Sequence, residues 1–132
     1  MVTQGEQRLA AILVADIEQY SRLMHEDERG TVLALRGTRE EVIKATLEHY
    51  SGKIIKNTGD GFLAEFTTIS GAVECAIEMQ TILIKRNRDI PKHRQLKFRM
   101  GINLGEVTFD DDDFYGDGVN VAARLEGVAE AP

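Results

Sequence analysis

The chain has 132 residues, of which 42% are hydrophobic and 29% charged, as in one ordinary globular domain. Its formal net charge of −6 argues against binding to a nucleic acid backbone, which needs a basic surface. The single cysteine excludes an intrachain disulfide, and no apolar run approaches the roughly 20 residues of a transmembrane helix. Residues 1–7 form a polar tail without a signal peptide's apolar segment, so we expect a cytoplasmic chain with no membrane insertion.

The first predicted element is a buried strand over residues 9–15, an apolar run that Asp16 breaks. Residues 17–50 then show a helical pattern, and Gly30 and Gly37 are candidate breaks between two helices. The predicted apolar face of this segment consists of Val32, Leu35, Val42, Ile43, Leu47 and Tyr50. Residues 53–57 and 62–66 form a predicted hairpin, since Gly-Asp-Gly at 59–61 tolerates the positive φ angles of tight turns.

A second helix is predicted after Ser70, a candidate N-cap, and Pro91 ends it. Its predicted apolar face consists of Ala72, Val73, Ala76, Ile77, Leu83 and Ile84. Residues 96–103 alternate as a strand, and Gly105 and Glu106 are predicted to turn the chain into a hairpin strand at 107–109. An acidic loop at 110–113 and a helix at 119–129 follow. This order predicts an α+β fold with a ferredoxin-like βαββαβ core, an added hairpin strand and a C-terminal helix.

Two aspartates are predicted to meet at one edge of this sheet. Asp16 ends the first strand and Asp60 precedes the third, and these strands are antiparallel neighbours in a ferredoxin-like core. Paired carboxylates suit Mg²⁺ or Mn²⁺, and two such ions can activate an attacking oxygen and stabilise a leaving one. The residues alone leave open that Asp16 only caps a helix and that Asp60 only belongs to a turn.

Four further polar residues are candidates for binding. Asn120 and Arg124 are four residues apart on one helical face, where the arginine fork would suit phosphate oxygens. Lys56 precedes the Asp60 turn and Asp113 ends the acidic run, and together they could read the polar edge of a purine. Taken singly, each of the four is better explained as a solvated surface residue.

Three stretches occur together in one order: VADIEQYS at 14–21, KNTGDG at 56–61 and DFYGDGVNVAAR at 113–124. With them the chain resembles the class III adenylate/guanylate cyclase catalytic domain, from about residue 8 to residue 132. The resemblance implies an adenylate cyclase, a phosphorus-oxygen lyase that converts ATP to 3′,5′-cyclic AMP and pyrophosphate. It also implies three residue sets: Asp16, Asp60 and the Ile17 backbone carbonyl for two Mg²⁺ or Mn²⁺ ions, Lys56 and Asp113 for adenine, and Asn120 and Arg124 for the transition state.

Family members act as head-to-tail dimers, so the resemblance implies a homodimer with two composite sites. The family's domain normally continues with further strands and a triphosphate-binding lysine, to which no residue here corresponds. We therefore expect a shortened domain from a protein with further C-terminal or regulatory parts, with weakened dimerisation and activity. A non-catalytic dimerisation module or inactive fragment stays open as an alternative. A diguanylate cyclase is a third hypothesis, but its Gly-Gly-Asp/Glu-Glu-Phe signature is absent.

Overall fold

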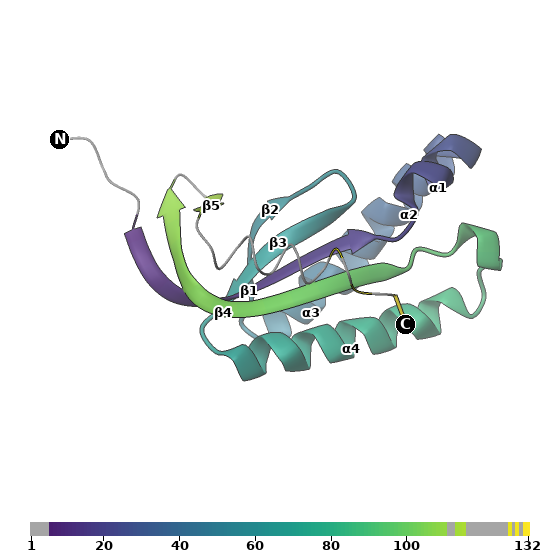
Figure 1. Ribbon diagram of the computed structural model, residues 1–132. Helices are drawn as coiled ribbons and strands as arrows, with labels where there is room; N and C mark the ends of the chain where they lie inside the picture. The colour runs from purple at the N-terminus through teal and green to yellow at the C-terminus, as the bar shows by residue number, and fades with distance from the viewer. Residues whose placement is uncertain (1–5, 111–112, 116–126, 128, 130) are drawn as a thin grey trace.

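The computed structural model describes residues 6–110, 113–115, 127, 129 and 131–132 (Figure 1). Five strands of this part form one antiparallel sheet in the order β2-β3-β1-β4-β5. The strands are β1 (Glu6–Ile17), β2 (Lys53–Asn57), β3 (Gly61–Phe66), β4 (Phe98–Asp110) and β5 (Asp113–Tyr115). The order β2-β3-β1-β4 is that of a ferredoxin-like sheet, so the predicted fold class is confirmed. The predicted helix at 119–129 lies almost wholly outside the described residues.

The helices pack on one face of this sheet, and Figure 1 shows α4 running along β4. They are α1 (Tyr20–Glu26), α2 (Glu28–Thr38), the π-helical segment η1 (Arg39–Ile43), α3 (Lys44–His49), α4 (Ile69–Asn87) and the 3₁₀ turn η2 (Lys92–Arg94). Alternate residues of β1, such as Leu13 and Ala15, join the core beneath the helices. Ile12 and Val14 point to the opposite side, called the far face below, where they cluster with Val107. None of the helices in the described part of the chain combines the length and apolar character that a membrane crossing requires.

The break in the first helical region lies at Asp27, and the predicted breaks at Gly30 and Gly37 are wrong. Asp27 caps α2 by accepting a hydrogen bond from the Gly30 backbone N–H. Val32 was expected in the core but is 38% exposed. The buried stripe of α2 consists instead of Thr31, Leu35 and Thr38. Both threonine hydroxyls donate to helix carbonyls, which lets polar side chains occupy core positions that an apolar pattern misses.

The core-facing side of α4 also differs from the predicted one. Its buried residues are Ala72, Cys75, Met79 and Leu83. They recur at steps of three and four residues, as one helical face requires. Val73, Ile77 and Ile84 lie on a neighbouring stripe and are exposed, Ile77 to 62%. Cysteine and methionine fill the core here, while three of the predicted β-branched residues face outward.

Thr68, and not Ser70, is the N-cap of α4. Its hydroxyl oxygen accepts a hydrogen bond from the Gly71 backbone N–H at 3.1 Å. We expect Thr68→Ala to lower the free energy of unfolding by about 1 kcal/mol, because an N–H in the first turn loses its partner. Ser70→Ala is the matched control and should change stability by less than about 0.5 kcal/mol. Urea unfolding of both variants measures this, and a larger loss for Ser70→Ala would contradict the assignment of the cap.

The predicted turn at Gly105 and Glu106 is wrong, because β4 continues through it. Those two residues pair with Ala10 and Leu9 of β1, so their backbones belong to the ladder. The strand that returns is β5, which follows residues 111–112 in the sequence and pairs with the last residues of β4. Figure 1 shows β4 curving strongly, with β5 brought beside β2, and the two strands are in contact. The two edges of the sheet therefore approach each other over the far face.

Candidate functional site

The structure brings Asp16 and Asp60 to the same point of the sheet. The pairing of β1 with β3 ends at Asp16 opposite Gly61. One residue further on, the Ile17 N–H donates to the Asp60 carbonyl at 3.1 Å. The Ile17 backbone is therefore joined to both candidate metal aspartates, to Asp16 through the chain and to Asp60 through this hydrogen bond. The topological argument for their convergence agrees with the structure.

Gly61 allows this approach for a different reason from the predicted one. No residue of the turn at 58–61 has a φ angle in the left-handed region that favours glycine. A Cβ at Gly61 would instead lie 1.8 Å from the Ala15 carbonyl oxygen and 2.9 Å from the Asp16 Cα. Glycine is thus required for the close contact of two backbones and not for the shape of the turn.

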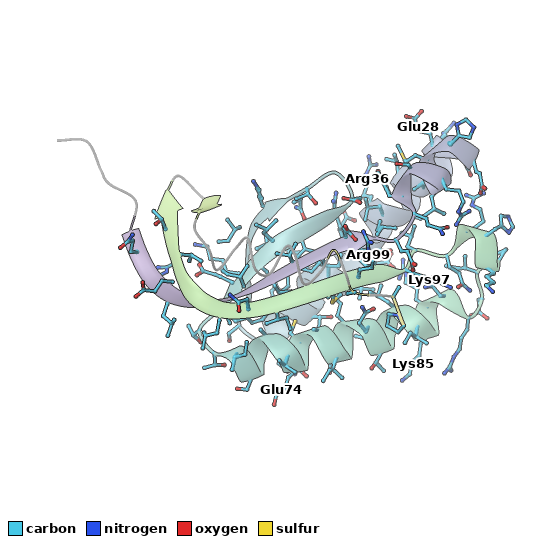
Figure 2. The ribbon with its side chains drawn as sticks, in the orientation of Figure 1. Glu28, Arg36, Glu74, Lys85, Lys97 and Arg99 are labelled. Atoms are coloured by element: carbon cyan, nitrogen blue, oxygen red, sulfur yellow. The ribbon has the colours of Figure 1, made fainter. Side chains whose placement is uncertain are left out.

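Arg99 completes this cluster and was missed by the sequence reasoning. It lies opposite Asp16 in the pairing of β1 with β4, near the start of β4 (Figure 2). Its Nε and Nη2 donate to the two oxygens of Asp16, each at 2.9 Å. Such a bidentate pair is among the strong side-chain hydrogen bonds. The register of β1 against β4 would have revealed it, because directly opposed residues share a face.

The pKa of Asp60 is raised above its usual value, firstly by burial and secondly by the Asp16 carboxylate. Its own backbone N–H, Arg99 and Arg39 act in the opposite direction but do not cancel these effects. Burial and the neighbouring carboxylate therefore outweigh the groups that stabilise the Asp60 anion. An added cation would favour the ionised form of Asp60.

The donor set fits a hard divalent cation. Two carboxylates and a backbone carbonyl are oxygen ligands, which such a cation prefers. The Arg99 guanidinium binds both oxygens of Asp16 in this structure, so an ion would compete with it for that carboxylate. Within the described ranges, no three His, Cys, Asp or Glu side chains lie close enough together to hold a metal ion. An ion at this site would thus need backbone, water or ligand oxygens beside Asp16 and Asp60.

Lys56 lies on the same far face as Asp16. It pairs with Leu63 on β3, and Leu63 pairs with Val14, two residues before Asp16. Asp113 is the first residue of β5 and pairs with Asp110. Lys56 and Asp113 thus belong to two edge strands that the curvature of β4 brings into contact. Asn120 and Arg124 lie outside the described residues.

The family model described as the adenylate and guanylate cyclase catalytic domain matches residues 2–132. The chain is 46% identical over 123 residues to putative adenylate cyclase 3 of Rhizobium meliloti (strain 1021), covering 93% of this chain and 21% of that protein. An adenylate/guanylate cyclase/hydrolase from Silicibacter pomeroyi is similar in structure, with a TM-score of 0.86 and 43% identity over 96% of this chain and 73% of that one. The guanylyl cyclase Cya2 has a TM-score of 0.83 at 24% identity, over 98% and 74% of the two chains, a likeness of fold alone.

Proposed function

The chain belongs to the adenylate and guanylate cyclase catalytic domain family, and from this premise we propose that it converts ATP to 3′,5′-cyclic AMP and pyrophosphate. The observation that carries the proposal is the convergence of Asp16 and Asp60 at the end of β1, on the far face that also bears Lys56. The name of the 46% identical relative, a putative adenylate cyclase, supports ATP as the substrate.

We assign Asp16, Asp60 and the Ile17 carbonyl to two Mg²⁺ or Mn²⁺ ions. When bound, the ions would lower the proton affinity of the ribose 3′-hydroxyl and neutralise phosphate charge. The part of the chain itself is to bring the two carboxylates to one point, although burial and the Asp16 carboxylate raise the pKa of Asp60 there. Arg99 reduces the repulsion between the two carboxylates through its bidentate pair with Asp16.

We assign Lys56 and Asp113 to the adenine base. Adenine presents a donor amine and a neighbouring ring acceptor, whereas guanine presents an acceptor at the position of the amine. A carboxylate would accept from the amine and an ammonium would donate to the ring nitrogen, so this pair suits adenine. The contact between β2 and β5 supports a joint role for the two residues.

Asn120 and Arg124 complete the proposal as the groups that stabilise the transition state. The arginine fork would bind the charge that grows on phosphate oxygens as the 3′-oxygen attacks, where fixed donors accelerate a reaction. In a head-to-tail homodimer, one subunit would supply the metal aspartates and its partner the purine and transition-state residues. Each dimer would contain two such composite sites.

Complementation tests this shared site. We expect Asp16→Ala and Arg124→Ala to be inactive singly and to regain about a quarter of the wild-type activity when mixed in equal amounts. Random exchange makes half of the dimers heterodimers, and each heterodimer has one intact site of two. The measurement is cyclic nucleotide formation after subunit exchange. An inactive mixture, despite exchange shown by two different tags, would contradict sites shared between subunits.

The reaction itself is tested by incubating the chain with ATP or GTP and Mn²⁺, with the product identified by mass spectrometry. Formation of 3′,5′-cyclic AMP from ATP, much faster than cyclic GMP from GTP, is the expected result. A preference for GTP would overturn the assignment of Lys56 and Asp113 to adenine. No cyclic nucleotide from either substrate, over a wide range of chain concentration, would overturn the enzymatic proposal.

A further inference from the structure

Arg39 occupies an unusual place for a charged residue. It is the first residue of the π-helical segment η1. Leu35, Ile43 and Leu47, at four-residue steps on either side of it, are all buried in the core. Arg39 therefore stands in an apolar row, where a helix packed on a sheet would ordinarily carry an apolar side chain. Isolated π-helical turns inside α-helices are frequent at functional sites.

The Arg39 side chain is directed at the backbone of the turn that carries Asp60. Its Nη2 donates to the Thr58 carbonyl at 2.7 Å and to the Gly61 carbonyl at 3.1 Å. These two carbonyls flank Gly59 and Asp60 in the sequence. The Gly61 carbonyl also accepts from the Thr58 N–H, so the guanidinium reinforces the hydrogen bond that closes the turn.

The turn is thus attached on two sides. On the β1 side, the Ile17 N–H donates to the Asp60 carbonyl. On the η1 side, Arg39 donates to the carbonyls of Thr58 and Gly61. The Nε of Arg39 is buried and finds no hydrogen-bond partner within the described part of the chain. Such a group costs free energy, so a purely stabilising role would be served at least as well by an apolar residue in this row.

We propose that Arg39 is a positioning residue that fixes the backbone of the Asp60 turn and so sets the distance between the carboxylates of Asp60 and Asp16. It acts through the turn and does not touch the substrate. The inference rests on the proposed function in one respect, that Asp16 and Asp60 hold metal ions. A residue that orients a metal ligand is expected to affect metal affinity by about 10- to 100-fold when removed.

Arg36 provides a matched control. It lies on α2, three residues before Arg39, and both side chains line the hollow of about 360 Å³ that Gly59 also lines. The Arg36 side chain is exposed and forms no hydrogen bond or ion pair with any described residue. Replacing it removes the same charge from the same surroundings without releasing the turn.

The experiment measures Mn²⁺ binding to the full chain by electron paramagnetic resonance, well below the unfolding temperature of each variant. Arg39→Met suits the apolar row and should fold, yet bind Mn²⁺ about 10- to 100-fold more weakly than the wild type. Arg39→Lys keeps the charge, but its side chain ends one bond short of the Nη2 that binds both carbonyls, so it should hold the turn less firmly and also bind Mn²⁺ weakly. Arg36→Met should bind as the wild type does. If Arg39→Met fails to fold, Arg39→Lys decides the question.

Wild-type Mn²⁺ affinity in folded Arg39→Met or Arg39→Lys would overturn the inference, whatever their thermal stability. An equal loss of affinity in Arg36→Met would also overturn it, because charge alone would then explain the effect. Asp60→Asn separates this outcome from failure of the proposed function. Undiminished Mn²⁺ binding in Asp60→Asn would overturn the metal site itself.

Discussion

The Gly61→Ala variant is expected to lose about 3 kcal/mol or more of its free energy of unfolding. The added Cβ would lie 1.8 Å from the Ala15 carbonyl oxygen, 2.7 Å from the Ala15 carbonyl carbon and 2.9 Å from the Asp16 Cα. All three atoms belong to the backbone of β1, so no side chain can move aside to relieve the clash. Relief requires β1 and β3 to separate at the end of their ladder.

Gly59→Ala is the control for this prediction, because its Cβ would have no atom within 4 Å. It should change stability by less than about 0.5 kcal/mol. Chemical denaturation of the two variants gives the comparison. Equal stability of the two would show that β1 and β3 can part here at little cost, and the close approach would not be what holds Asp60 beside Asp16. Folded Gly61→Ala protein should also bind Mn²⁺ weakly, since its two carboxylates would be further apart.

The sequence predicted those parts of the fold that depend on one strand or one local turn. The strand Lys53–Asn57 was predicted with its observed bounds, and the buried strand β1 was recognised from its apolar run. Asp16 and Asp60 were identified because each lies at the end of a strand, and the strand order then brings them together. Strand ends and strand order are sufficient to predict this convergence, because the end of one antiparallel strand lies beside the start of its neighbour.

What the sequence did not predict depends on register and on contacts between distant segments. Arg99 is 83 residues from Asp16, and its pairing follows only from the register of β4 against β1. Arg39 was missed because its partners are backbone carbonyls, which no side-chain pattern reveals. A charged residue at a four-residue step between Leu35 and Ile43 was the available signal. The continuous β4 was missed because Gly105 suggested a turn, whereas the long β1 pairs with β4 through that position.

Asp60→Asn is expected to abolish cyclic nucleotide formation, by at least about 100-fold, and at the same time to stabilise the metal-free chain at neutral pH. Burial, followed by the Asp16 carboxylate, raises the pKa of Asp60 in the folded state. The stability that this group contributes is therefore fully present below its unfolded pKa and is lost as the pH rises through its folded pKa. Asparagine carries no charge and avoids this loss, although it cannot serve as an anionic ligand.

Added Mn²⁺ should reverse the order of stability, so that the wild type becomes more stable than Asp60→Asn. A ligand that binds only the folded wild type raises its stability by RT ln(1 + [L]/Kd), and the variant gains much less. Thermal unfolding at several pH values, with and without Mn²⁺, gives both comparisons. A metal-free Asp60→Asn variant less stable than the wild type at neutral pH would contradict the charge repulsion inferred at this site.

Asp27→Asn is a control for which we expect the opposite change of stability at neutral pH. The pKa of Asp27 is lowered, first by the Gly30 backbone N–H and further by Arg94, so its contribution is present above its unfolded pKa and is lost as the pH falls. Its replacement should lower stability at neutral pH and leave the response to Mn²⁺ unchanged. The two aspartates thus differ in what their charge does. At Asp27 the Gly30 N–H and Arg94 stabilise the charged carboxylate, whereas at Asp60 burial and the Asp16 carboxylate outweigh the groups that stabilise the charge.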